Sequence, residues 1–281
     1  MFSSFYEPLP DLNKALERIG LKDFSCKYDL ECLDLLIRSF AAHVPYENLE
    51  VSIEHHLPSL ESKGLFDKIV TRRRGGYCFE MNGFFWLLLR DLGFDAYSVS
   101  VYVLEDLDFM TDLGHRATII TIDGKKYFSD VGYGSGSTAA FAIPLDGSIR
   151  NGFFISYDET RREHTLYKVV DPEAERQHGT ERFVEKRTSA DGAVFCKKIV
   201  MFRDFIAYPQ EFNLPNIGVF HSKGNRMIET PVCNFCNEKG EIYSIRNWTF
   251  TAKTAEGRTE RPIQGEADLL DLAGKYFGIY L

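Results

Sequence analysis

The stretch RRRGGYCFE, at residues 72–80, decides how the first part of the chain is built. Gly75 and Gly76 permit a sharp turn, and the residues that follow have helical periodicity. Gly93 stands where this helix would end, and its apolar positions are Met81, Phe85, Leu88 and Leu92. The sequence therefore predicts an amphipathic helix with the Cys78 thiol directly before it.

A thiol at the start of a helix favours nucleophilic chemistry. The free N–H groups and positive partial charge of a helix N-terminus stabilise a thiolate and lower the thiol pKa, and the N–H groups can also form an oxyanion hole. A single cysteine is more often a small buried side chain without a chemical role. Because glycines, arginines and a helix start coincide at Cys78, we interpret it as a candidate nucleophile.

Helical periodicity also covers the residues before this stretch. Asp11 is a plausible N-cap for a first helix, and Asp29 for a second helix that stops before Pro45. The apolar positions are Leu12, Leu16 and Ile19 in the first helix and Leu33, Leu36, Ile37 and Phe40 in the second. We expect the N-terminal third to be a helical bundle.

From Ala96 onward the apolar period changes to two, which is typical of β-strands. Asp123-Gly124 is the strongest hairpin signal, because this pair suits a two-residue turn. The β-like segments are residues 97–103, 117–122, 125–131, 166–170 and 194–201. The last quarter is mixed: we expect loops at Pro209, Pro215 and Pro231, a hairpin at 241–251 and a helix around Leu269, Ala273, Tyr276 and Phe277.

The hairpin supplies a base for the thiol. If its loop contains two residues, Asp130 faces Ala117, and alternation of side chains puts His115 on the same side of the sheet, diagonal to Asp130. A carboxylate in that position fixes the imidazole tautomer and stabilises the imidazolium, as a Cys-His-Asp triad requires. Read alone, such a pair is more often a structural hydrogen bond, but its agreement with Cys78 favours catalysis.

These motifs resemble the arylamine N-acetyltransferase family. The resemblance rests on RGGYCFE at 74–80, Gly114-His115, DVGYG at 130–134, VPYENL at 44–49 and, more weakly, PNIGVF at 215–220. It implies an α+β fold with a cysteine-protease-like Cys-His-Asp core. The implied parts are a helical bundle (residues 1–93) carrying the nucleophile, an antiparallel β-barrel (94–205) carrying His and Asp, and an α/β lid (206–281).

The resemblance also implies an activity and a set of site residues. Acetyl-CoA would acylate Cys78, with His115 as base and then acid and Asp130 orienting it, before an arylamine or arylhydrazine takes the acetyl group in a ping-pong reaction. The resemblance places Tyr46 and Phe220 near the acceptor. Separately, the glycine-rich segment at residues 132–137 allows close backbone approach, which suits an extended pantetheine arm beside Cys78 and assigns Gly132, Tyr133 and Gly134 to coenzyme A, although a plain β-turn fits these glycines equally well. Three positions depart from the family pattern: Tyr46, Tyr133 and Arg116.

Other functions remain open at this point. The triad also fits an amide synthase that closes a macrolactam, and a cysteine hydrolase or transglutaminase-like enzyme. Cys233 and Cys236, with His221 upstream, could instead belong to a metal-binding or thiol-binding module, although a structural zinc site needs a second ligand pair that is absent. We therefore expect no metal. For Arg74 we expect a structural salt bridge.

The composition indicates which classes of partner and which cellular compartment to expect. The 281 residues carry a net charge of -8, which argues against nucleic acid or an anionic membrane as the main partner. The first ten residues have no basic and apolar signal pattern, and six cysteines are thinly spread, which fits free thiols in a reducing compartment. The expected setting is cytoplasmic, with coenzyme A and a small amine as partners.

Overall fold

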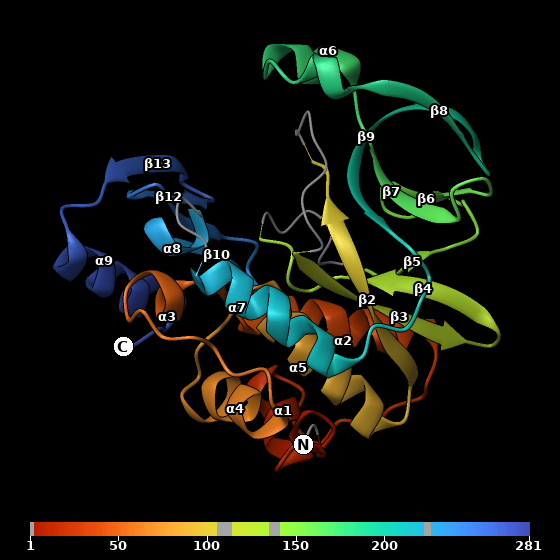
Figure 1. Cartoon of the computed structure of the whole chain (residues 1–281). Helices are drawn as coiled ribbons and strands as arrows, with labels where there is room; N and C mark the ends of the chain where they lie inside the picture. Colours follow the sequence, from red (N-terminus) through yellow and green to blue (C-terminus); the bar gives the residue numbers. More distant parts are fainter. Residues whose placement is uncertain (1–2, 106–113, 135–140, 222–225) are drawn as a thin grey trace.

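The computed structural model describes residues 3–105, 114–134, 141–221 and 226–281. Figure 1 shows an eight-stranded sheet on the right, a five-stranded sheet on the left and the N-terminal helices below them. Both sheets are antiparallel. The fold is therefore mixed α and β, as the sequence predicts.

The N-terminal part is helical. Asp11 caps α1 by accepting from the Lys14 N–H, and Asp29 caps α2 by accepting from the Cys32 N–H, so both predicted N-caps are confirmed. The elements are η1 (Ser3–Phe5), α1 (Leu12–Arg18), α2 (Leu30–His43), α3 (Leu49–Ser52), α4 (Ser62–Phe66), the π-helical turn η2 (Asp67–Thr71) and α5 (Cys78–Leu92).

Helix α5 joins the helices to the sheet. Every residue from Cys78 to Leu89 is buried, and α5 packs against both β2 and β3. Gly93 ends the helix with φ +97°, a left-handed conformation that suits glycine. The predicted helix is thus confirmed, and Cys78 is its first residue.

The eight-stranded sheet forms a nearly closed antiparallel barrel. Its main path runs β5-β4-β3-β2-β9-β7-β6, with β8 paired to β9, and the end strands β5 and β6 contact each other. The strands are β2 (Asp95–Val103), β3 (His115–Ile122), β4 (Lys125–Ser129), β5 (Ile143–Pro144), β6 (Phe153–Asp158), β7 (Glu163–Val169), β8 (Glu185–Ser189) and β9 (Gly192–Phe202). Helices α6 (Pro172–Gln177) and η3 (Glu181–Phe183) connect β7 to β8.

The β3–β4 hairpin has the predicted register. Asp123 and Gly124 both have positive φ, at +50° and +74°, as a two-residue hairpin turn requires. Thr118 pairs with Ser129, so the opposed positions are those that the sequence predicts. Strand β4 ends at Ser129, earlier than predicted, and Asp130 lies in the segment directly after it.

The five-stranded sheet takes one strand from the N-terminal part. Its order is β1-β10-β11-β12-β13, and β1 precedes the whole barrel in sequence. The strands are β1 (Tyr46–Glu47), β10 (Val232–Cys236), β11 (Ile242–Arg246), β12 (Thr249–Thr254) and β13 (Gly257–Pro262). The associated helices are η4 (Pro209–Phe212), α7 (Asn213–His221), α8 (Arg226–Glu229), α9 (Glu266–Leu272) and the π-helical turn η5 (Ala273–Phe277).

Two of the predicted loop prolines lie in helices. Pro209 is the first residue of η4 and Pro215 is the third residue of α7. The prediction was wrong because proline is tolerated in a first helical turn, where its missing N–H would have no intrahelical partner.

Among the described residues, no helix combines the length and apolar character that crossing a membrane requires.

Candidate active site

Cys78 lies at the start of α5, held by the residues beside it. Its thiol lies 3.7 Å from the Gly114 carbonyl oxygen and is mostly buried. Tyr77 is the N-cap residue, and its backbone N–H donates to Glu80 Oε2 at 3.1 Å. The Tyr77 hydroxyl donates to the Asn216 side chain on α7. The helix start that carries the thiol is therefore fixed from two sides.

The structure brings His115 and Asp130 together. His115 is the first residue of β3, Asp130 follows the last residue of β4, and Nε2 lies 2.6 Å from Asp130 Oδ2. Both residues are buried. Cys78 also makes a side-chain hydrogen bond with His115. The three predicted residues thus form one connected chain, from thiol to imidazole to carboxylate.

The charge state of the imidazole follows from these contacts. Burial alone lowers the His115 pKa, but the Asp130 carboxylate and the Cys78 thiol raise it, and together they bring it from the ordinary 6.5 to about 10. The imidazole is therefore protonated at neutral pH and can pair with a thiolate.

Sequence reasoning missed Asn82, which orients the carboxylate. Its Nδ2 donates to Asp130 Oδ1 at 2.8 Å and to the Arg116 carbonyl at 2.6 Å, while its Oδ1 accepts from the Val131 N–H at 3.1 Å. Asn82 lies one helical turn after Cys78, so α5 positions both the thiol and the support of its partner. That spacing of four is the signal that could have found it.

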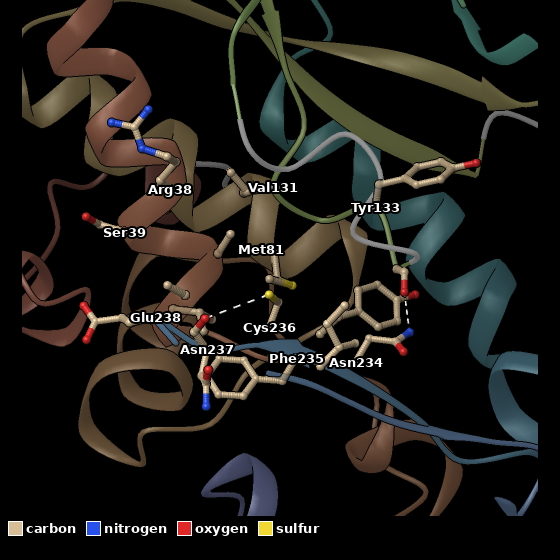
Figure 2. A pocket seen from close by; sticks show the side chains of 16 residues that line it. Arg38, Ser39, Met81, Val131, Tyr133, Asn234, Phe235, Cys236, Asn237 and Glu238 are labelled. Atoms are coloured by element: carbon tan, nitrogen blue, oxygen red, sulfur yellow. Dashed lines mark hydrogen bonds between the residues drawn. The ribbon is translucent and has the colours of Figure 1, made fainter. Parts of the chain in front are cut away.

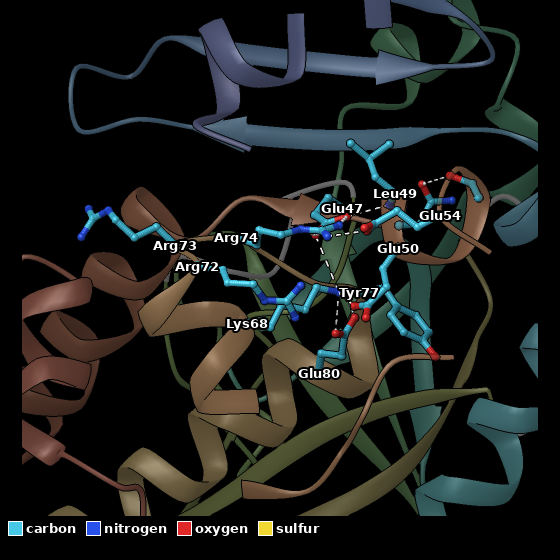
Figure 3. Close-up of polar contacts among 12 residues, drawn as sticks. Glu47, Leu49, Glu50, Glu54, Lys68, Arg72, Arg73, Arg74, Tyr77 and Glu80 are labelled. Carbon is cyan, nitrogen blue, oxygen red and sulfur yellow. Dashed lines mark hydrogen bonds and ion pairs between the residues drawn. The ribbon is translucent and has the colours of Figure 1, made fainter. Parts of the chain in front are cut away.

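A buried cluster of charged side chains lies behind the helix start. We call it the Lys68 cluster, and Figure 3 shows its members: Glu47, Glu50, Glu54, Lys68, Arg74 and Glu80. Lys68 Nζ lies 2.6 Å from Glu80 Oε1 and 2.5 Å from Glu50 Oε2. Arg74 lies 3.0 Å from Glu47 and 2.5 Å from Glu54, which confirms the predicted structural salt bridge.

The Lys68 cluster contains more acids than bases. Four carboxyl groups face two cations, and burial together with Glu50 and Glu47 outweighs Lys68 and raises the Glu80 pKa from 4.5 to about 7. Burial disfavours charge at Glu47 too, but Lys68 and Arg74 prevail and lower its pKa. The cluster binds the loop before Cys78 to the chain around β1.

Glycines let two segments, the loop before Cys78 and the residues after β4, approach their neighbours closely. A Cβ at Gly75 would lie 1.7 Å from the Pro45 carbonyl oxygen, and one at Gly132 would lie 2.9 Å from Cys78 Cα. A Cβ at Gly134 would lie 3.0 Å from the Tyr46 ring. Residues 135–137, the remainder of the glycine-rich segment at 132–137, lie outside the described residues.

A cavity of about 550 Å³ lies between α2, α5 and β10 (Figure 2), and Cys78 itself is not among its lining residues. Tyr46, Tyr133 and Gly134 line it, whereas Gly132 and Phe220 are not among its lining residues. Tyr46 packs against the apolar cluster that contains Cys78, and burial, followed by Cys78, raises the pKa of its phenol. The remaining lining residues are Arg38, Ser39, Ala41, Ala42, Val44, Met81, Val131, Asn234, Phe235, Cys236, Asn237, Glu238 and Ile242.

The Cys233 and Cys236 thiols do not form a site together. Both lie on β10, where side chains three positions apart point to opposite faces of the sheet. Accordingly Cys233 is fully buried, whereas Cys236 is exposed. A shared metal ion or a disulfide needs the two sulfur atoms on the same side. The described residues hold no group of three or more side chains suited to a metal ion.

Comparisons with known proteins identify the family. A family model described as N-acetyltransferase matches residues 29–281. The arylamine N-acetyltransferase of Mycolicibacterium smegmatis is 34% identical over 168 residues, which are 57% of this chain and 60% of that protein. Arylamine N-acetyltransferase 1 of Homo sapiens is 33% identical over 126 residues, 44% of this chain and 43% of that protein. The matches thus span about half the length of these curated relatives.

Solved structures share the fold. The arylamine N-acetyltransferase from Salmonella typhimurium superposes with a TM-score of 0.78 at 19% identity, covering 97% of this chain and 92% of that one. The Mycobacterium marinum enzyme, solved in complex with CoA, gives a TM-score of 0.75 at 19% identity, covering 96% and 93%. The family model carries the assignment, since it spans nearly the whole chain. This chain belongs to the arylamine N-acetyltransferase family.

Proposed function

We propose that this protein transfers an acetyl group from acetyl-CoA to arylamines and arylhydrazines through an acyl-thioester on Cys78. The observation that carries the proposal is the connected chain from the Cys78 thiol through His115 to Asp130, built at the start of a buried helix. Family membership supports the acetyl transfer.

The first half-reaction acylates the cysteine. The Cys78 thiolate attacks the thioester carbonyl carbon, the bond from that carbon to the coenzyme A sulfur breaks, and His115 gives its proton to the departing thiolate. Asp130 keeps the imidazole in the right tautomer and orientation throughout. The free N–H groups at the start of α5 face the developing negative charge of the carbonyl oxygen.

The second half-reaction releases the product. The amine nitrogen attacks the Cys78 thioester, neutral His115 accepts the proton that the nitrogen loses, and the amide leaves as the thiolate and imidazolium form again. Acetyl-CoA and amine thus become free coenzyme A and acetylated amine. In the proposed reaction no metal is required, because the imidazole handles both proton transfers.

We also assign residues to each substrate. We assign Gly132, Tyr133 and Gly134 to the coenzyme A side, supported by the CoA complex of the Mycobacterium marinum relative. We assign Tyr46, which lines the cavity, and Phe220 on α7 to the acceptor side. Aromatic surface favours a planar acceptor through stacking and apolar burial. Arylamines also carry a free lone pair at neutral pH, whereas alkyl amines are mostly protonated.

Intact-mass measurement with acetyl-CoA tests the covalent step. We expect one acetyl group per chain, mapped by peptide analysis to Cys78 and to none of Cys26, Cys32, Cys196, Cys233 and Cys236. An acetyl group on another cysteine, or none at all, would overturn the mechanism. Peptide hydrolysis without acetyl transfer would point instead to a cysteine hydrolase, and cyclisation of a long amino-acyl thioester to an amide synthase.

The acceptor assignment has its own test. We expect a higher kcat/KM for an aniline than for an alkyl amine of similar size, and a higher KM for the aniline in Tyr46→Ala and in Phe220→Ala. Because Tyr46 lines the cavity and Phe220 does not, the larger change should belong to Tyr46. Equal rates for the two amines, or activity losses that follow loss of thermal stability, would remove the support for this pocket.

A further inference from the structure

Two thiols remote from the active-site chain lie in contact. Cys26 is in the loop between α1 and α2, Cys32 is in the first turn of α2, and their sulfur atoms are 3.0 Å apart. Both are free thiols in the structure. Cys26 is partly exposed and Cys32 is buried, so a small oxidant reaches the pair from the Cys26 side.

The backbone between the two cysteines is held in place. Asp29 Oδ1 accepts from the Cys32 N–H at 2.8 Å, which fixes the start of α2. Tyr28 has a positive φ of +57° and packs its ring edge-on against Phe94, with 5.6 Å between the ring centroids. These contacts bring the two sulfur atoms together before any bond forms.

We propose that Cys26 and Cys32 form a reversible disulfide, an oxidation site separate from the catalytic cysteine. A small disulfide such as oxidised glutathione is the oxidant. The Cys26 thiolate attacks it and releases one glutathione; the Cys32 thiolate then attacks the mixed disulfide and releases the second. Two S–H bonds are lost, one S–S bond forms, and two molecules of reduced glutathione carry away the electrons and protons.

The other cysteines offer no such pair. Among the six, all of which the structure describes, Cys233 and Cys236 point to opposite faces of β10. The Cys196 thiol is buried, 3.6 Å from the Glu185 carbonyl. The Cys26 pair is therefore the one that can close without moving a strand.

Closing the disulfide would stabilise the helix that walls the cavity. The bond ties the loop to the first turn of α2, and Ser39, Ala41 and Ala42 on the last turns of α2 line the cavity. A short loop closed by a disulfide restricts the unfolded chain, and we expect the melting temperature to rise by about 2–6 °C. Burial, followed by the neighbouring Cys32 thiol, raises the Cys26 pKa to about 12, so closure should accelerate as pH rises.

Peptide mapping tests the proposal without reference to acetyl transfer. Trypsin cleaves after Lys22, Lys27 and Arg38, so Cys26 and Cys32 fall in different peptides, each with one cysteine. After treatment of the full chain with oxidised glutathione, we expect these two peptides to be joined, and dithiothreitol to separate them. An unjoined pair, glutathione on both cysteines, or a disulfide elsewhere would overturn the proposal.

Two variants serve as matched controls. Cys26→Ser should abolish the joined peptide and the rise in melting temperature, whereas Cys236→Ser, which replaces another accessible thiol, should leave both unchanged. Cys26 is partly exposed, so its replacement should not prevent folding. A rise in melting temperature that persists in Cys26→Ser would also contradict the proposal, because the stabilisation would then have another source.

Discussion

Two groups of buried charges flank the start of α5, and they differ in what they touch. The His115–Asp130 pair contacts the Cys78 thiol and contains one base and one acid. Among the described residues, the ion pairs of the Lys68 cluster do not include the thiol; they join the loop before Cys78 to the residues around β1. Proximity to Cys78 therefore does not by itself give a buried charge a chemical role.

The difference lies in what each group does when a member is lost. Removing one partner of a buried ion pair leaves an uncompensated charge, which is costly to stability. In the His115–Asp130 pair, loss of the Asp130 carboxylate also removes the group that orients the imidazole in the proposed reaction. We therefore expect the pair to control the rate and the cluster to control folding, and the following changes can break or sharpen that division.

The largest expected effect is that of Asp130→Asn on the rate. An amide cannot stabilise the imidazolium and favours the wrong tautomer, so we expect acylation of Cys78 to slow by ~10³-fold or more. Rapid-quench measurement of the acetylated enzyme gives this rate. Circular dichroism should show a folded variant, and near-normal acylation would mean that Asp130 is a structural residue only.

Lys68→Met should show the opposite pattern. The substitution leaves Glu80 and Glu50 buried without their cation, and we expect the free energy of unfolding to fall by about 3 kcal/mol. Urea denaturation measures it. Lys63→Met is the matched control, because the Lys63–Glu7 pair is exposed and should contribute less than about 1 kcal/mol. Equal losses in the two variants would contradict a stabilising role for the cluster.

The two groups should also titrate in different pH ranges. The His115 pKa is raised from 6.5 to about 10, so its contribution to stability is complete below pH 6.5 and is lost as pH rises through 10. The Glu80 pKa is raised from 4.5 to about 7, so the folded state binds the extra proton and stability falls as pH rises from 4.5 to 7.

Urea denaturation from pH 4.5 to pH 10.5 separates these ranges. The difference in unfolding free energy between the parent and Asp130→Asn should shrink as pH approaches 10, while Glu80→Gln should flatten the profile below pH 7. If both variants changed the unfolding free energy over the same pH range, the His115–Asp130 pair and the Lys68 cluster would titrate as one coupled group.

The smallest effect is expected at the rim of the Lys68 cluster. Glu54 is partly exposed, and Arg74 keeps its pair with Glu47 when Glu54 is replaced. We expect Glu54→Gln to lower the unfolding free energy by about 1 kcal/mol or less, measured by urea denaturation, with unchanged acylation. A loss of unfolding free energy as large as that of Lys68→Met would show that exposed and buried members of the cluster contribute equally to stability.

The sequence predicts what short-range patterns determine. Asp123-Gly124 set the hairpin register, and with it the approach of His115 to Asp130, because the turn and the alternation are local. Neither Asn82 nor Lys68 could be assigned in this way. Their partners lie on other elements, and an isolated Asn or Lys in a sequence does not reveal which carboxylate it will meet.

The five-stranded sheet shows the same limit. Strand β1 has two residues, too few for a periodic signal, and it becomes a strand only because β10 pairs with it. Helix α7 was missed for another reason. Pro215 and Gly218 lower its helical propensity, and tertiary contacts such as that of Asn216 with Tyr77 compensate.

The pairing of β1 with β10 has a consequence for the order of folding. Tyr46 lies opposite Asn234, so a wall of the cavity joins the first quarter of the chain to the last. Such distant contacts form late, because the entropy cost of closing a long loop must be met before the contacts stabilise the chain. On the ribosome, the helices and much of the barrel can form while the C-terminal strands are still being synthesised. Cys78 thus emerges early, and the cavity closes only after the C-terminal strand β10 has been synthesised.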